Sequence, residues 1–178
     1  MEVTMSKALT FFKETSFSDC SLSALMSHID LTTGSFYKAF SNKNKIMHII
    51  LEKILYDFTF QTEKLIHKNT SIEYKFKEFI YLILSDDGIL GNKLIKTAYF
   101  LSESDSIIQN HINSLYQQLS KSCMEILFQN NNKNHDNKID DTLPNYLLGL
   151  YFSNKVPNSL TKLNEKIDTL AIKFLKDK

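Results

Sequence analysis

The chain has 178 residues, enough to bury a substantial hydrophobic core, and its hydrophobic and charged fractions of 43% and 23% are typical of a globular protein. Its formal net charge of +1 does not indicate a class of partner, because only the distribution of charge along the chain can do so. Four glycines and two prolines are too few for the many turns of a β-sandwich or barrel, so the composition favours an all-α fold.

The pattern of apolar residues predicts about nine helices and no strand, because these residues recur at helical spacing along nearly the whole chain. The expected helical segments, in chain order, are 3–13, 22–26, 32–40, 42–67, 72–83, about a dozen residues around 94–99, about 104–126, 143–151 and 160–174. Ser71 is a candidate N-cap for the fifth segment, and Glu103 or Ser104 for the seventh. The Asn-rich stretch 130–141 is expected to be a mobile loop.

The cysteines and the N-terminus bear on where the protein works. Cys20 and Cys123 lie far apart and form no CxxC or Cys/His ligand pattern, so we expect reduced thiols in a cytoplasmic protein with no metal and no cofactor. A redox role for either thiol stays open. The first residues contain no long apolar run, and no segment reaches the roughly 20 apolar residues of a membrane span, which argues against a signal peptide and a membrane protein.

Residues 21–40 have the length and pattern of a helix-turn-helix. Ser21 would cap a short first helix, Asp30 would lie in the turn, and Thr32 would cap a second helix. An Asp in the turn is compatible with this motif, because Asp tolerates left-handed backbone geometry better than most residues.

The first turn of the second helix is built from small residues, Thr33, Gly34 and Ser35. Hydroxyl groups at a helix N-terminus suit a phosphate backbone, and Gly34 removes a side chain where the helix would approach a duplex closely. Thr33, Ser35 and Lys38 would project outward, within reach of base edges or phosphates.

The aromatic residues of this helix divide between two faces. Phe36 and Phe40 are four positions apart and would anchor the helix to its neighbours. Tyr37 lies off that face, where its hydroxyl could reach a phosphate.

Acidic residues are absent from the same region. Between Leu31 and Leu51 there is no Asp or Glu, whereas Lys38, Lys43 and Lys45 all fall inside. An ordinary surface helix with a solvated lysine face is the alternative interpretation. The helix-turn-helix spacing, the hydroxyl-glycine start and the lack of acids together favour DNA binding.

The segment LxxLMSHIDLTTGSFYKAFSNKNKI resembles the DNA-binding signature of TetR-type transcriptional regulators, which read roughly TSVxxIAxxxGVSxGxLYxxFxSKxxL. The residues in matching positions are Ser21, Leu22, Leu25, Leu31, Thr32, Gly34, Phe36, Tyr37, Phe40, Lys43 and Ile46. Residues 8–17 resemble the first helix of that family and its following turn, and later segments resemble its other helices less specifically. Cys20, Met26 and Asp30 depart from the usual Thr, Ala and Gly.

The resemblance implies a three-helix DNA-binding domain at residues 1–47, with the helix-turn-helix at about 21–40, followed by a helical ligand-binding and dimerisation domain at 48–178. The residues it implies at the DNA are Ser21, Thr32, Thr33, Gly34, Ser35, Tyr37, Lys38 and Lys43.

Two further sets of residues follow from the same resemblance. A pocket for a small apolar or aromatic effector would be lined by aromatic residues of the later helices, with Phe58, Tyr81, Tyr99, Tyr116 and Tyr151 as candidates. A homodimer interface would be formed by the last two helices, with Leu143, Leu147, Leu150, Leu163, Ile167, Leu170 and Phe174 as candidates. Packing inside a single chain is the alternative explanation for both sets.

The leading interpretation is therefore a ligand-responsive transcriptional regulator, a repressor that binds a palindromic DNA operator as a homodimer and is released by its effector. The alternative is a helical interaction or sensor protein of the same fold that has lost sequence-specific DNA binding. His48 with Glu52 is interpreted as an exposed or ion-paired couple rather than a metal site, and Glu63 with His67 likewise. The sequence shows no paired carboxylates and no nucleophile–base arrangement, so we do not expect an enzyme.

Overall fold

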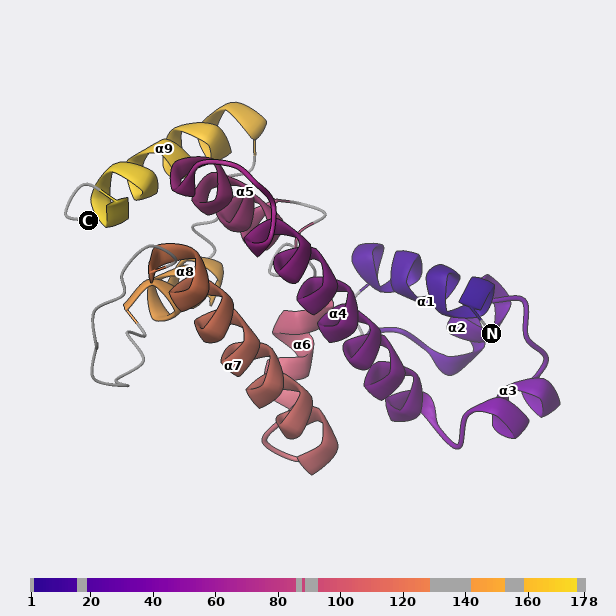
Figure 1. Ribbon diagram of the computed structural model, residues 1–178. Helices are drawn as coiled ribbons and strands as arrows, with labels where there is room; N and C mark the ends of the chain where they lie inside the picture. The colour runs from indigo at the N-terminus through magenta and orange to yellow at the C-terminus, as the bar shows by residue number, and fades with distance from the viewer. Residues whose placement is uncertain are drawn as a thin grey trace. The chain divides into compact units, whose positions relative to one another are not determined.

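A computed structural model describes residues 2–15, 19–85, 88, 93–128, 142–152 and 159–175 (Figure 1). Within these ranges the chain forms nine α-helices and no strand, which confirms the predicted all-α fold. The helices are α1 (Glu2–Glu14), α2 (Leu22–His28), α3 (Thr33–Ala39), α4 (Lys43–Ile66), α5 (Ile72–Leu84), α6 (Lys93–Leu101), α7 (Ser106–Phe128), α8 (Thr142–Phe152) and α9 (Leu160–Leu175). The loop expected at 130–141 lies outside the described residues.

Several helices begin where a side-chain oxygen can accept an otherwise unpaired backbone N–H. Ser21, Thr32 and Ser71 each accept the N–H of the residue three positions later, at 3.1, 3.3 and 3.2 Å, which confirms all three predicted caps. The cap of α7 is Asp105, one residue beyond the predicted Ser104. Asp is among the strongest N-cap residues, so this site could have been found from the sequence.

The helices pack as two compact units. Unit 1 comprises Met1–Leu55 and Asn92–Asn113, and unit 2 comprises Tyr56–Gly91 and Ser114–Lys178. Both α4 and α7 therefore contribute residues to each unit. The functional boundary expected at residue 47 stays a prediction.

The core of unit 1 is formed where α1 packs against α2 and α6 and where α3 and the start of α4 add large apolar side chains. Its fully buried side chains include Phe12, Leu25, Phe36, Phe40, Ile46 and Met47. Because the large aromatic residues of α3 are part of this core, the helix is held in one orientation about its own axis.

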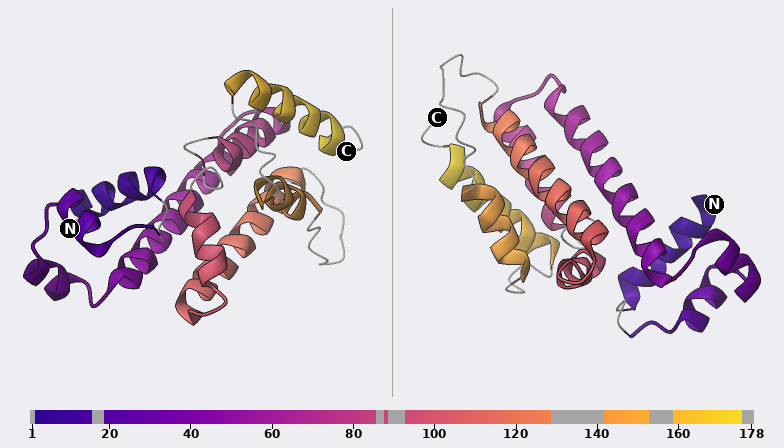
Figure 2. Two further views of the ribbon diagram at one scale, coloured as in Figure 1. Left: turned by 180° about the vertical axis from the view of Figure 1, so that it is seen from behind. Right: turned by 90° about the horizontal axis from the view of Figure 1, so that it is seen from below.

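The core of unit 2 is organised around α5, against which α8 and α9 pack (Figures 1 and 2). Phe76, Phe79, Ile80 and Ile83 of α5 are completely buried. At the edge of this core, the Lys77 ammonium lies 2.8 Å from a carboxylate oxygen on α5 and 2.8 Å from one on α9. Among the described residues, no helix has the length and apolar character needed to cross a membrane.

The residues predicted at a dimer interface are mostly buried inside the single chain. Those with 7% exposure or less are Leu143, Leu147, Leu150, Leu163, Ile167 and Leu170. The half-buried Phe174 lies beside Phe76, with ring centroids 6.4 Å apart. Internal packing, the alternative left open by the sequence, accounts for this burial. The dimer role of these seven residues stays a prediction.

Candidate nucleic-acid interface

α2 and α3, seven residues each, are joined by a tight turn. Asp30 adopts the left-handed region at φ 54°, and the N–H of Leu31 bonds the carbonyl of Met26 at 2.9 Å. The prediction that Asp can occupy this turn is confirmed. The Asp30 carboxylate accepts a hydrogen bond from Lys7 of α1, and this bond lowers the pKa of Asp30. The turn thereby contacts the first helix through an exposed ion pair.

The inner face of α3 is aromatic. Phe36 is 0% exposed and Phe40 is 2% exposed, and their ring centroids are 5.4 Å apart. Both residues were predicted to anchor the helix, and their burial confirms that prediction. They determine which side of α3 faces outward.

The outer face of α3 carries the side chains that were predicted to contact DNA. Thr33, Ser35 and Lys38 are exposed, and Tyr37 is 54% exposed. Gly34 is also exposed, and a Cβ atom added there would meet nothing within 4 Å. The packing of the protein itself therefore does not require glycine at this position.

The hydroxyls of Ser21 and Thr32 are engaged at the starts of their helices. Thr32 Oγ1 accepts the N–H of Ser35 at 3.3 Å and donates to the Ser35 hydroxyl at 3.0 Å. Ser21 accepts the N–H of Ala24 at 3.1 Å. Both residues are exposed, so they hold the helix starts at the surface.

Lys43, predicted to hold a phosphate, has a structural contact that the sequence did not reveal. Its ammonium donates a hydrogen bond of 2.6 Å to the carbonyl oxygen of Cys20, next to the start of α2, and its side chain is half-buried. The first turn of α4 is thus tied to the helix-turn-helix. No sequence signal identifies such a pair, because the two residues are 23 positions apart and one partner is a backbone carbonyl.

The two cysteines are buried thiols. Burial raises the pKa of the Cys20 thiol, although the Lys43 ammonium acts in the opposite direction. A raised pKa reduces the thiolate fraction and so reduces reactivity at neutral pH. The raised pKa of Cys20 therefore does not support a redox role for this thiol.

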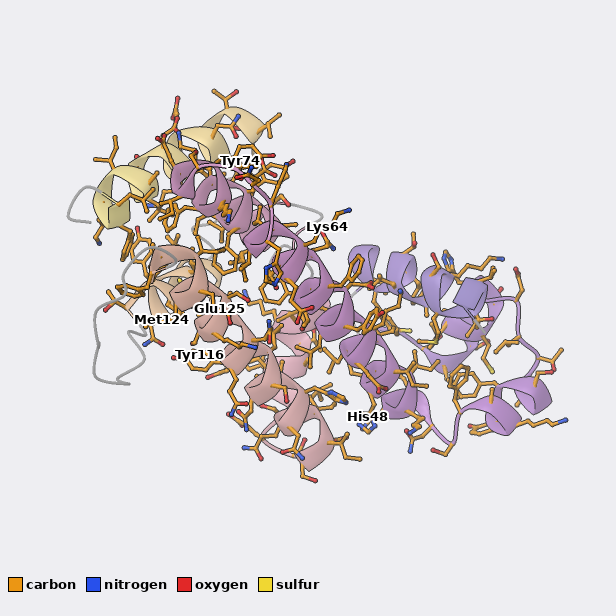
Figure 3. All side chains as sticks on the ribbon, in the orientation of Figure 1. His48, Lys64, Tyr74, Tyr116, Met124 and Glu125 are labelled. Carbon is orange, nitrogen blue, oxygen red and sulfur yellow. The ribbon has the colours of Figure 1, made fainter. Side chains whose placement is uncertain are left out.

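The aromatic residues predicted to line an effector pocket have different environments. Phe58 is 4% exposed and packs on Phe79, whereas Tyr81 and Tyr99 are 40% and 46% exposed. Tyr116, labelled in Figure 3, donates a hydrogen bond to the side-chain oxygen of Asn145 at 3.2 Å. Tyr99 belongs to unit 1 and the other candidates to unit 2. The side chain of Tyr151 lies outside the described residues.

Three grooves of unit 2 are lined by residues other than the five predicted pocket residues. The groove between the ends of α4 and α7 has a volume of about 580 Å³ and includes Ile66, Met124 and Phe128. Two more, of about 640 and 580 Å³, lie between α5 and α9 and between α4 and α5. None of the five predicted pocket residues lines these three grooves, so their role in effector binding stays a prediction.

Comparison with known proteins shows which solved structures share the fold. No family model matches the chain, and no curated protein matches its sequence. Among solved structures, the reduced form of Escherichia coli NemR matches with a TM-score of 0.72 at 14% identity, covering 99% of this chain and 95% of NemR. A Clostridium perfringens protein assigned as a fatty acid metabolism regulator matches with a TM-score of 0.60 at 15% identity, covering 97% and 96%. This chain shares their fold. At 14% and 15% sequence identity, these similarities establish a shared fold and no shared function.

Proposed function

We propose that the chain is a transcriptional regulator that binds duplex DNA through the outer face of α3. The observation that carries the proposal is the division of α3 into two faces. Phe36 and Phe40 are buried, so Thr33, Ser35 and Lys38 are presented outward from a stretch that contains no acidic residue. A surface of hydroxyls and lysines without carboxylates suits a polyanion.

The available side chains also indicate how DNA would be read. The chain contains no arginine, so phosphates would be contacted by lysine ammonium groups and hydroxyls rather than by bidentate guanidinium groups. Thr33 and Ser35 can bond either donors or acceptors on base edges, and Tyr37 and Lys43 would contact phosphates. Sequence preference would then depend on α3, and overall affinity on the lysines.

The proposal includes a homodimer, a palindromic operator and a small apolar or aromatic effector that releases the DNA. A two-fold dimer places two recognition helices on half-sites one DNA turn or more apart. Leu160 and Ile172 of α9, 62% and 56% exposed, are apolar side chains available to a second copy. The protein would act by binding rather than by catalysis, as a repressor in the cytoplasm.

Selection from a random library of duplexes, followed by titration of the recovered sequence at several salt concentrations, tests the DNA-binding proposal. We expect affinity that falls steeply with salt, and loss of sequence preference when Thr33 and Ser35 are both replaced by alanine. Lys64→Ala, at an exposed site of α4 in unit 2, is the matched control. If no duplex is bound with salt-dependent affinity, the fold serves instead as an interaction or sensor protein.

A further inference from the structure

A polar cluster connects α4 to the start of α7 within unit 1. The carboxylate of Asp105 accepts the backbone N–H groups of Ile107 and Ile108 through Oδ1, at 3.0 and 3.1 Å. Its Oδ2 lies 3.1 Å from Nε2 of His48 and 3.5 Å from the side-chain nitrogen of Asn44, both on α4. One carboxylate therefore caps α7 and holds the first turns of α4 at the same time.

A second histidine lies beside this contact. His111 of α7 has its ring centroid 6.4 Å from that of His48, and it is half-buried. The His48 and Asp105 side chains are also shielded, at 13% and 18% exposure. Figure 3 shows His48 projecting from the first turns of α4. The charged groups facing His111 are Glu52 and His48 from α4 and Asp105 from the start of its own helix.

The electrostatics of the cluster favour one protonation state at neutral pH. Burial lowers the pKa of His111, and His48 lowers it further, against the opposing effects of Glu52 and Asp105. Burial would raise the pKa of Asp105, but the N–H of Ile108 and the His48 ring hold it below its ordinary value. Asp105 is therefore ionised and His111 neutral at neutral pH.

We propose that His48, Asp105 and His111 form a proton-sensitive clasp between α4 and α7, closed while His111 is neutral and loosened when His111 takes up a proton. Burial and the neighbouring His48 both disfavour a positive charge on His111, and separation of the two helices relieves both effects. The expected effect on DNA binding rests on the proposed function. Movement of α4 would reach the DNA-binding surface because α4 begins at Lys43, which contacts the start of the helix-turn-helix.

The pH window follows from the direction of the pKa shift. A histidine whose pKa is lowered in the closed state stabilises that state above its ordinary pKa of 6.5, and this stability is lost as the pH falls. At pH 5.5, about one unit below the ordinary pKa, protonation of a released His111 favours the open state by up to about tenfold. DNA affinity should therefore fall by up to about tenfold per protomer between about pH 7.5 and 5.5.

The clasp itself is tested without DNA, by NMR titration of the imidazole Cε1–H signals with EDTA present throughout. His111 should titrate below 6.5 in the wild-type protein. His48→Gln should raise its midpoint, because a like charge is removed, and Glu52→Gln should lower it. A midpoint at or above 6.5, or one unmoved by both variants, overturns the clasp.

The regulatory effect is tested by titrating the selected duplex against wild type, His111→Gln and His67→Gln across the same pH range. His67 is an exposed histidine near the other end of α4 and is the matched control. We expect wild type and His67→Gln to lose affinity on acidification and His111→Gln to lose much less. Parallel loss in all three overturns the regulatory role of the clasp. Absence of DNA binding at every pH contradicts the proposed function instead, and the NMR titration still tests the clasp.

Discussion

Replacing Lys43 with alanine should weaken DNA binding by the same factor on every duplex, because a phosphate contact carries no base information. The structure adds a second effect. The Lys43 ammonium bonds the Cys20 carbonyl at 2.6 Å. A hydrogen bond from a charged group contributes about 1.5–3 kcal/mol when well buried, so this half-buried one should contribute about 1 kcal/mol to the stability of unit 1. The variant should therefore lose both stability and affinity.

Salt dependence separates these two effects. Removing one phosphate-binding side chain makes the slope of log affinity against log salt shallower by about 0.9 for each protomer bound, whereas a purely structural defect leaves the slope unchanged. Titrations of two unrelated duplexes from about 50 to 200 mM salt give this slope and the ratio of the two affinities. Lys64→Ala is the control, since Lys64 is an exposed lysine of the same helix, α4, that lies in unit 2.

Two results would contradict this reasoning. A change in the ratio of affinities between the duplexes would mean that Lys43 reads bases. An unchanged slope with a lower unfolding temperature would mean that Lys43 only holds α4 against the start of α2.

The other predictions concern the core, the recognition helix and assembly. Phe36→Ala should destabilise unit 1 by about 3–5 kcal/mol, measured by urea unfolding, because a fully buried aromatic side chain is removed; a loss below about 1 kcal/mol contradicts its anchoring role. Thr33→Ala and Ser35→Ala should each change the sequences recovered in selection, and identical recovered sequences argue against base contacts. Leu147→Glu should misfold rather than yield folded monomers, because Leu147 is 0% exposed in the single chain. Sedimentation that finds wild-type monomers at micromolar concentration rules out the dimer.

The features predicted correctly from the sequence are those determined by neighbouring residues. The helices follow from apolar periodicity, and the caps at Ser21, Thr32 and Ser71 follow from the preference of hydroxyl residues for helix starts. The burial of Phe36 and Phe40 follows from their spacing on a single helix. Each of these inferences uses residues within a few positions of one another.

The features missed depend on residues far apart in the chain. His48 was interpreted from its own helix, whereas its closest polar partner is Asp105, 57 positions later. The Lys43 contact with the Cys20 carbonyl has no counterpart in any sequence pattern. Both pairs require the fold before they can be identified, since periodicity predicts which face of a helix is polar but not which polar group lies opposite.

The apolar stripes of α8 and α9 show a related limit. Periodicity predicted correctly that Leu147 and Leu170 face an apolar surface. It could not determine whether that surface belongs to the same chain, because burial against α5 and burial against a second copy select the same residue types. The exposure of a side chain in the single chain distinguishes these two possibilities. Leu160 and Ile172 are exposed, so they are the apolar residues of α9 available to a second copy.

Communication between effector and DNA would need elements shared by the two units, and α4 and α7 are such elements, since each contributes residues to both. The clasp of His48, Asp105 and His111 joins these same two helices within unit 1. An effector bound in unit 2 and a proton bound at His111 would then act on one equilibrium, the position of the first turns of α4. By linkage, the factor by which each ligand lowers DNA affinity cannot exceed its own preference for the state that does not bind DNA. Protonation of one histidine changes this equilibrium by at most about tenfold per pH unit, so acidification would adjust the response to the proposed effector rather than replace it.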